Sequence, residues 1–467
     1  MADGSVETGK RAEAAARGTA RTRRLIEGPI LPTLARLSLP NIVFAFISTT
    51  AIVMDAFYVG RLGVAPLAAL ALVFPIQTLM QMISSGAMGG GISSAVARAL
   101  GAGDRVRAES VIAHSLVIAV AMAATFTLLF GLFARPIFAV LGGVGAALEG
   151  AVAYAEIVFG GAIILFITNT FSSVLRGTGN MMVPAATLIG TTVAGAILSG
   201  TLTLGWFGVP PLGIRGPAVA FLAASAAAGA ILFAYLTSGV AGLHLRWRGT
   251  VLSRAIFNDI LKVGLVASGN ATLTIVTIIV VTGLVGRYGT EALAGYGLGS
   301  RLELILIPIA FGVGGALTAM VGASFGAKQY ARARHVALVG GLIVFAVTAA
   351  LGITVSLAPD LWIGLFTTDP AATEIGRRYL RIAGTCYAFF GMGMTLYFAS
   401  QGTGSMVWPF TAGFVRLCVA AGGGALVALV FGASLEWLFA CVGLGLVLFG
   451  SIILGSLRSR EWNPEKI

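Results

Sequence analysis

The sequence predicts an all-α integral membrane protein with twelve transmembrane helices, as judged from its composition, its long apolar segments and an internal repeat. Of its 467 residues, 57% are hydrophobic and only 10% are charged, whereas soluble domains carry about a quarter charged residues. The mean hydropathy is +0.96. A hydrocarbon core about 30 Å thick needs roughly 20 apolar residues per helix, so the chain is predicted to reside in a bilayer.

Apolar segments of that length follow one another from residue 33 to residue 456. We expect spans at residues 33–59, 66–92, 111–134, 151–174, 182–205, 216–238, 260–285, 292–319, 336–358, 378–400, 408–431 and 436–456. The many glycines suit close packing of helix backbones in a membrane.

The repeat divides these spans into two halves. Three blocks match at offsets of 225 or 226 residues (321 minus 96, 286 minus 60): residues 60–63 with 286–289, 96–109 with 321–334, and 177–184 with 402–409. Each half holds an even number of spans, so the halves share one orientation and are related by an axis along the membrane normal. The sequence therefore predicts two pseudo-symmetric six-helix lobes.

The expected organisation follows from this division. We predict a disordered basic cytoplasmic tail at residues 1–28, an N-lobe at 29–240, a cytoplasmic linker at 241–258, a C-lobe at 259–457 and a cytoplasmic C-terminal tail at 458–467. With the N-terminus inside, the inner side receives 21 of the 30 Lys and Arg residues, which follows the positive-inside rule. Both termini are therefore predicted to be cytoplasmic.

Several function classes find no support in the sequence. The net charge of +12 is explained by topology, so no nucleic-acid partner is expected. The cysteines and histidines lack metal-ligand spacing, so no metal is expected. A P-loop-like run at residues 4–11 has Arg11 where the motif needs Ser or Thr. We therefore expect neither an enzyme nor an ATP-driven pump, but a carrier that uses an ion gradient.

Acidic residues inside spans are the first candidates for function, because each costs several kcal/mol in a bilayer. Asp55 lies roughly one turn before the end of the first expected span, and its repeat counterpart is Val281. Glu303 lies near the middle of the eighth span. Alternatively, Asp55 is an interfacial acid paired with Arg61, and Glu303 is a structural acid paired with Arg416.

Pro40, the segment around Asp55, the two Gly-Ala connections and the two Gly-Thr-Gly loops give the chain a resemblance to the multidrug and toxic compound extrusion (MATE) family. Asp55 and Arg301-Leu302-Glu303 look most like its DinF-type branch. The resemblance implies a V-shaped fold and export of amphiphilic or cationic organic compounds by antiport with H⁺ or Na⁺.

The resemblance has two departures. Gly195 and Ser199 stand where many relatives carry Asn and Asp in the fifth span, which weakens the case for a larger proton-relay network. The seventh and tenth spans lack the carboxylates of the family's cation site, so sodium coupling is less expected than proton coupling. Asp55 is thus predicted to be the main proton-coupling carboxylate, with Glu303 as a second candidate.

The substrate cavity leaves a weaker signal. Polar and aromatic residues inside the spans are its candidate lining, although interhelical hydrogen bonds or lipid contacts explain such residues equally well: Asn41, Phe57, Tyr58, Gln77, Asn169 and Asn270. We expect a monomer in the inner or plasma membrane that requires no cofactor. A flippase for a lipid-linked precursor is the alternative, and it should show more basic residues in the cavity.

Overall fold

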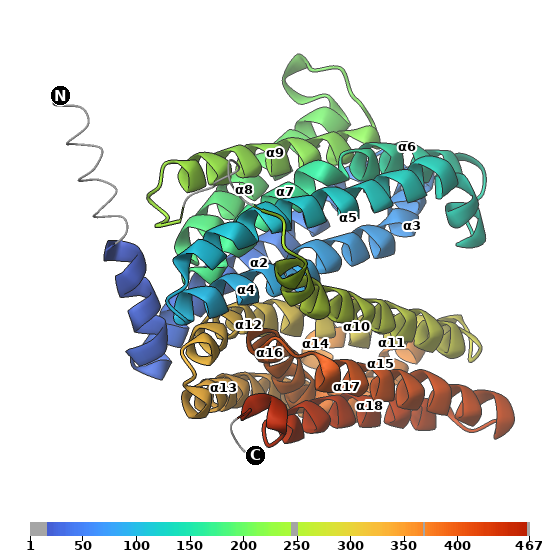
Figure 1. Cartoon of the computed structure of the whole chain (residues 1–467). Coiled ribbons are helices and arrows are strands. Elements are labelled where there is room, and N and C mark those ends of the chain that lie inside the picture. The colour runs from blue at the N-terminus through green and yellow to red at the C-terminus, as the bar shows by residue number, and fades with distance from the viewer. Residues whose placement is uncertain (1–15, 244–250, 368, 465–467) are drawn as a thin grey trace.

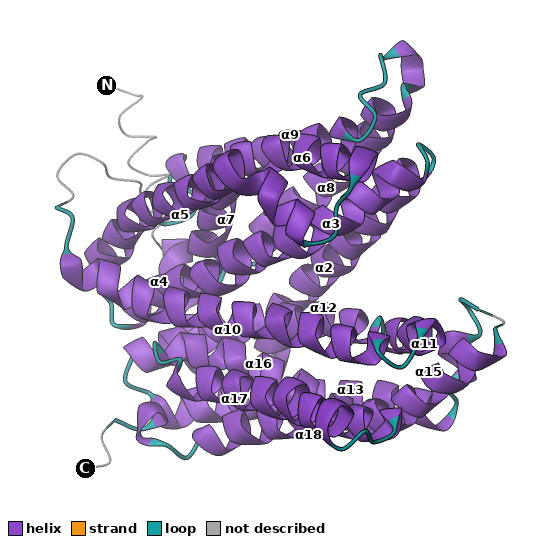
Figure 2. Cartoon of the chain, turned by 90° about the vertical axis from the view of Figure 1, so that its right-hand side faces the viewer, coloured by secondary structure: helices purple, strands orange, loops and turns teal. Residues whose placement is uncertain are grey.

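The computed structural model describes residues 16–243, 251–367 and 369–464, which form helices and turns without a strand (Figure 2). Within these residues, eleven helices are long and apolar enough to cross a membrane. A bent pair of helices, with an angle of 47° between them, makes a twelfth span. The twelve spans predicted from the sequence are confirmed.

The first six spans form the N-lobe, which occupies the upper half of Figure 1. In chain order they are α2 (Ile30–Gly60); α3 (Val64–Gln81), η1 (Met82–Met88) and α4 (Gly89–Gly101); α5 (Arg105–Val140); the bent pair α6 (Gly145–Gly160) and α7 (Ala162–Gly177); α8 (Met182–Leu204); and α9 (Arg215–Thr237). A short 3₁₀ turn, η2 (Trp206–Gly208), follows α8.

The other six form the C-lobe. They are α10 (Arg254–Gly286); α11 (Thr290–Ser300) and α12 (Glu303–Gly326); α13 (Tyr330–Leu357); α15 (Pro370–Ala383), η3 (Gly384–Cys386) and α16 (Tyr387–Thr403); α17 (Val407–Leu417), η4 (Cys418–Gly423) and η5 (Leu426–Val430); and α18 (Leu435–Ser456). The short helices α14 (Asp360–Ile363) and η6 (Arg460–Trp462) lie outside the spans.

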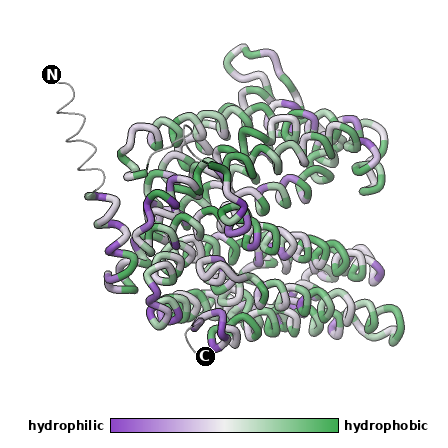
Figure 3. The backbone as a smooth tube through the Cα atoms, viewed as in Figure 1, coloured by the Kyte–Doolittle hydropathy of each residue, from purple (hydrophilic) through white to green (hydrophobic). Residues whose placement is uncertain are grey.

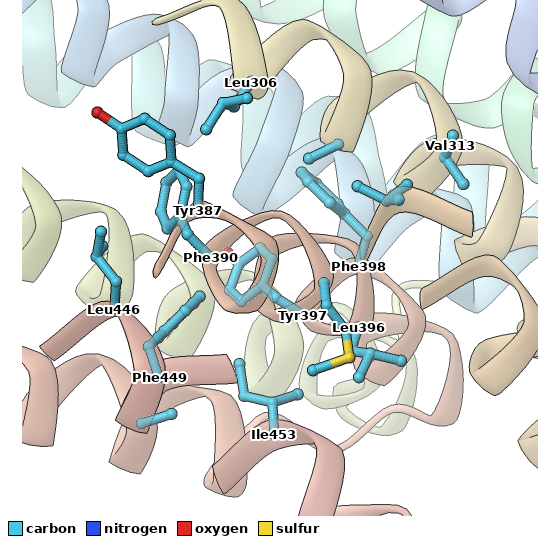
Figure 4. Packing of buried hydrophobic residues seen from close by; sticks show 14 of the residues in the cluster. Leu306, Val313, Tyr387, Phe390, Leu396, Tyr397, Phe398, Leu446, Phe449 and Ile453 are labelled. Atoms are coloured by element: carbon cyan, nitrogen blue, oxygen red, sulfur yellow. The ribbon is translucent and has the colours of Figure 1, made fainter. Parts of the chain in front are cut away.

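Each lobe has its own apolar core. One cluster of buried residues runs from Ala69 to Ile260, and the other consists mainly of residues from Val263 onward. Figure 4 shows part of the second cluster, where Tyr387, Phe390 and Phe398 of α16 pack toward α12 and α18. A separate core in each lobe is expected if each repeat folds as its own helical bundle.

The repeat is visible in the backbone of the turns. Matching connections place a left-handed residue at matching positions, with φ of +119° at Gly63 and +113° at Gly289, and +77° at Gly179 and +83° at Gly404. Glycine adopts such values without a steric penalty. In the third pair of turns, Lys328 is the repeat counterpart of Gly103. Both residues have a positive φ, although Lys328 carries a side chain.

The lobes touch at one end and diverge toward the other, as Figure 2 shows. The contact is made by α12, which packs against α2 and α4, and by α10, which packs against η1 and α4. Gly101 and Gly326, which are repeat counterparts (326 minus 101 is 225), each lie against the backbone of the opposite lobe, at Ala323 and Arg98. The pseudo-twofold axis therefore passes between α4 and α12.

The first described helix, at residues 16–27, and the last described element, η6, lie at the end where the lobes touch, and hydrophilic residues gather there (Figure 3). The predicted disorder of the N-terminal tail is wrong for residues 16–27, which form a helix. Leu25 is 3% exposed within the C-lobe core, and the Arg332 guanidinium donates to the Gly28 carbonyl at 2.5 Å. One buried apolar side chain, Leu25, and one partly exposed cation, Arg332, thus order this segment. In the linker, α10 begins at Arg254, five residues before the expected start of the C-lobe (259 minus 254).

Candidate coupling and substrate sites

Asp55 lies 25 residues from the first residue of α2 (55 minus 30), about 38 Å along the helix, toward the end where the lobes diverge. Its half-buried carboxylate accepts a hydrogen bond from the Ser199 hydroxyl of α8 at 2.5 Å. The ion pairs of the described residues do not include Asp55. When ionised, this carboxylate therefore has a neutral hydroxyl as its hydrogen-bond donor and no adjacent cation.

Ser199 is the residue that sequence reasoning missed. It was read as a departure from a relay pattern, yet the structure places it on the Asp55 carboxylate and buries it to 2% exposure. Because α8 packs along α2, a short hydroxyl at this position reaches the acid. No spacing rule pairs position 55 with position 199, so only the packing of the two helices reveals the contact.

Aromatic rings surround this end of α2. The Tyr58 ring meets Trp206 edge-on at a centroid distance of 5.4 Å, and Phe57 is 59% exposed. The Arg61 guanidinium lies 5.3 Å from the centroid of the Phe57 ring. The alternative in which Arg61 pairs with Asp55 is therefore not realised, since this cation faces an aromatic ring instead.

The remaining N-lobe candidates hydrogen-bond between helices. Gln77 accepts from the Tyr154 hydroxyl of α6 at 3.2 Å, and Asn169 donates to the Ser84 hydroxyl at 2.9 Å. Tyr154 also interacts electrostatically with Asp55, so Gln77 belongs to the surroundings of that acid. Asn169 is 8% exposed, and its bond to η1 gives it an interhelical role.

Glu303 occupies a different environment in the C-lobe. Its carboxylate accepts a hydrogen bond of 2.5 Å from the Tyr379 hydroxyl of α15. Tyr379 is 0% exposed, and its ring meets that of Tyr296 edge-on at 5.2 Å. Glu303 also interacts electrostatically with Arg416. This acid is partly exposed, as Asp55 is, but it has a fully buried tyrosine as its donor and a cation nearby.

Arg416 lies between aromatic rings rather than on the carboxylate. Its guanidinium is 5.1 Å from the centroid of Phe390 and 5.8 Å from that of Phe449, and the residue is 7% exposed. The ion pairs of the described residues do not include the pair with Glu303 expected from the sequence. Cation–π contacts and a longer-range attraction to Glu303 stabilise this buried charge.

Asp259 of α10 ties the lobes together at their touching end. It pairs with Arg98 of α4 at 2.8 Å, with Arg107 of α5 at 3.1 Å and with Lys262 at 3.5 Å. Arg98 also donates to the Gly402 carbonyl at the end of α16 at 3.3 Å. One carboxylate with three cations, two of them from the opposite lobe, holds this end closed.

The predicted cavity residues therefore do not form one site. Asn41 lines a cavity between the lobes, described below. Gln77 and Tyr58 lie near Asp55, whereas Asn270 is 5% exposed within the C-lobe, where its Oδ1 faces Gly413. The described residues contain no group of three or more His, Cys, Asp or Glu side chains placed to hold a metal ion.

Two repeated six-helix lobes with a carboxylate inside a span of each define the class of the protein as a multi-pass membrane transporter. The family model MatE matches residues 40–201 and 267–425, one block in each lobe. The chain belongs to the multidrug and toxic compound extrusion family, whose members are transporters and not enzymes.

Individual relatives agree with this assignment. The chain is 28% identical over 355 residues to the probable multidrug resistance protein YoeA of Bacillus subtilis, covering 75% of this chain and 76% of that protein. It is 27% identical to the probable multidrug resistance protein NorM of Thermotoga maritima (71% of each chain) and 24% identical to a FAD transporter of Shewanella oneidensis (84% and 86%).

Solved structures share the fold. A MOP superfamily transporter from Pyrococcus furiosus superimposes with a TM-score of 0.87 at 23% identity, covering 95% of this chain and 98% of that chain. An outward-facing multidrug resistance MATE transporter gives 0.80 at 24% identity, covering 92% and 95%. The predicted V of two lobes is thereby confirmed.

Proposed function

We propose that this MATE transporter exports amphiphilic organic cations in exchange for protons, and that Asp55 binds the proton. The observation that carries the proposal is the carboxylate of Asp55, which lies inside a membrane span with a single neutral donor, Ser199, and without an ion pair among the described residues. An ionised carboxylate in such a place costs several kcal/mol. A bound proton or a bound cation removes that cost.

The same site therefore favours an exchange. If proton and cationic substrate compete for one carboxylate, the arrival of either releases the other, and the two are never carried together. A proton moving down 100 mV supplies about 2.3 kcal/mol, and each pH unit of gradient adds about 1.4 kcal/mol. One proton exchanged for one monovalent cation moves no net charge, so the voltage contributions cancel and each pH unit supports a concentration ratio of about ten.

The surroundings of Asp55 fit a flat, partly apolar cation. Phe57 is 59% exposed, and Tyr58, three residues after Asp55, packs edge-on against the partly exposed ring of Trp206. Aromatic faces attract organic cations and bind apolar groups without fixed geometry. This combination supports amphiphilic cations over strongly hydrated ions, and H⁺ over Na⁺ as the coupling ion.

Orientation completes the proposal. The end where the lobes touch carries most of the Lys and Arg residues and is assigned to the cytoplasmic side of the plasma membrane. The Arg98–Asp259 pair then closes the cytoplasmic end, and the lobes diverge toward the outside. Each lobe has its own apolar core within one chain, which supports a monomer as the working unit.

The test is cation-triggered proton efflux from acid-loaded proteoliposomes with an internal pH dye. Wild-type protein should respond to lipophilic cations independently of Na⁺, and Asp55→Asn should lose at least about 90% of the response, because an amide cannot exchange a proton. Glu149→Gln, which removes an acid from an exposed ion pair with Arg135, is the matched control and should behave as wild type. Retained efflux in Asp55→Asn together with loss in Glu303→Gln would move the coupling site to the C-lobe.

A flippase for a lipid-linked precursor is the second candidate. Its supporting observation is Arg176, a basic residue in the cavity between the lobes. One arginine does not make the continuous cationic groove that a lipid diphosphate needs. The absence of any cation response in the same vesicles, with transfer of a labelled anionic lipid between leaflets, would favour this reading.

A further inference from the structure

A small cavity lies where the two lobes meet, and several of its lining residues are related by the internal repeat. Its lining comes from both lobes, namely Asn41, Ser85, Gly86, Gly89, Gly90, Ser93 and Arg176 from the first and Phe311, Gly315, Thr318, Phe398 and Gln401 from the second. Four pairs in this set are repeat counterparts separated by 225 residues: Gly86 and Phe311, Gly90 and Gly315, Ser93 and Thr318, and Arg176 and Gln401 (401 minus 176). The cavity therefore lies on the pseudo-twofold axis.

One of the four pairs differs in charge, because Arg176 brings a positive charge and Gln401 does not. Arg176 is 8% exposed, and the ion pairs of the described residues do not include it. Its Nη2 donates to the Ser173 hydroxyl at 2.8 Å and weakly to the Ser85 carbonyl at 3.4 Å. A guanidinium has five N–H donors, so most of its capacity remains for a ligand in the cavity.

Other polar groups of the cavity also lack partners. The Ser93 hydroxyl and the Gln401 carbonyl oxygen are buried, with no hydrogen-bond partner among the described residues. The Gln401 amide nitrogen donates to the Gly86 carbonyl at 3.0 Å, which fixes the side chain across the lobe interface. Asn41 places its amide nitrogen against Gly315. Buried polar groups without partners are costly, so these groups favour a bound species.

We propose that this axial cavity binds one small anionic group, a halide or a carboxylate, through Arg176, Ser93 and the amide nitrogen of Asn41. The space accommodates a group of about the size of a water molecule and excludes a whole drug. The Gln401 oxygen accepts a hydrogen from a water beside the anion or from a hydroxyl on it. Asn41 lies 14 residues before Asp55 on α2 (55 minus 41), about 21 Å away along the helix, so this site is distinct from the proposed proton site.

Because residues of both lobes line the cavity, an occupant should stabilise the contact between the lobes. The test is the melting temperature of the purified protein in discs of neutral lipid, titrated with chloride against gluconate at constant ionic strength. Wild-type protein should show a saturable rise with chloride. Arg176→Gln should weaken the apparent affinity at least about tenfold, whereas Arg135→Gln, which removes the same charge from an exposed pair, should leave it unchanged.

A second variant and a direct observation keep the proposal testable if Arg176→Gln fails to fold. Asn41→Leu keeps the charge and should weaken chloride about three- to tenfold. In crystals grown with bromide, an anomalous peak should lie beside the Arg176 guanidinium. A response that does not saturate, or that is the same in Arg176→Gln and wild type, would overturn the proposal.

The source of the anion is distinguished by two further titrations. Chloride binding at least about tenfold more tightly than acetate would assign the site to a free halide, which occupies the small cavity as a single atom. Acetate binding at least about tenfold more tightly than chloride would assign it to a carboxylate group, whose two oxygens match the forked donors of a guanidinium. Either result supports an anion site at Arg176.

Discussion

The two lobes carry the same tyrosine in two different settings. Tyr154 and Tyr379 are repeat counterparts (379 minus 154 is 225), and each donates its hydroxyl across a lobe. In the N-lobe the acceptor is the neutral amide of Gln77 at 3.2 Å, and in the C-lobe it is the carboxylate of Glu303 at 2.5 Å. The N-lobe instead places its acid on the first helix, at Asp55, where Val281 stands in the C-lobe.

This difference separates a compensated acid from an uncompensated one. Glu303 has a buried tyrosine donor and a nearby Arg416, so its charge is part of the packed C-lobe. Asp55 is half-buried and has one serine as donor, so its charge is available to a mobile partner. The comparison teaches that duplication preserved the scaffold while each lobe acquired its own chemistry.

The largest expected effect concerns stability. Glu303→Gln should lower the free energy of unfolding by about 3 kcal/mol, because the buried Tyr379 hydroxyl loses its charged acceptor and Arg416 loses a longer-range attraction. Asp55→Asn should change it by less than about 1 kcal/mol, since no ion pair is broken. Thermal and denaturant unfolding in one detergent would measure both. A large loss in Asp55→Asn would break the distinction between the two acids.

The next effect compares the matched tyrosines. Tyr379→Phe should cost about 2 kcal/mol, since it removes a hydrogen bond to a charged group, whereas Tyr154→Phe should cost about 1 kcal/mol for a neutral one. Both variants remove one hydroxyl at equivalent places in the fold, so each serves as the control for the other. Equal losses in the same unfolding assay would mean that the charge of Glu303 does not set the difference.

The smallest effect concerns Ser199. Ser199→Ala should slow cation-triggered proton efflux about threefold, because the carboxylate loses its hydroxyl donor, a change of less than 1 kcal/mol in the limiting barrier. In the Asp55→Asn background the same substitution should add nothing, since its effect passes through the acid. An additional loss in the double variant would show that Ser199 acts on something other than Asp55.

Sequence reasoning recovered the architecture because its signals are local. Apolar length predicted the spans, and Gly-rich motifs at one offset predicted the matching turns at Gly63 and Gly289 and at Gly179 and Gly404. Asp55 and Glu303 stood out as acids in apolar segments. Their roles in coupling stay predictions, as do the cytoplasmic termini and the DinF-type branch.

What the sequence missed depends on contacts between distant residues. The N-terminal helix is ordered by Leu25 and Arg332, about 300 residues apart (332 minus 25). Arg416 was expected beside Glu303 but lies between Phe390 and Phe449. Arg176 is one of the 21 basic residues that the topology places on the inner side, yet packing buries it in the axial cavity.

By itself, the sequence determined that this chain crosses a membrane twelve times in two repeated halves, because hydrophobic length and repeated motifs are properties of the chain alone. The tertiary structure decided which partner each charged side chain has: a lone serine, Ser199, for Asp55, the buried Tyr379 for Glu303 and the opposite charge of Asp259 for Arg98. The physical reason is that the cost of a buried charge depends on the atoms within a few ångströms of it. Those atoms come from helices that only the folded protein brings together.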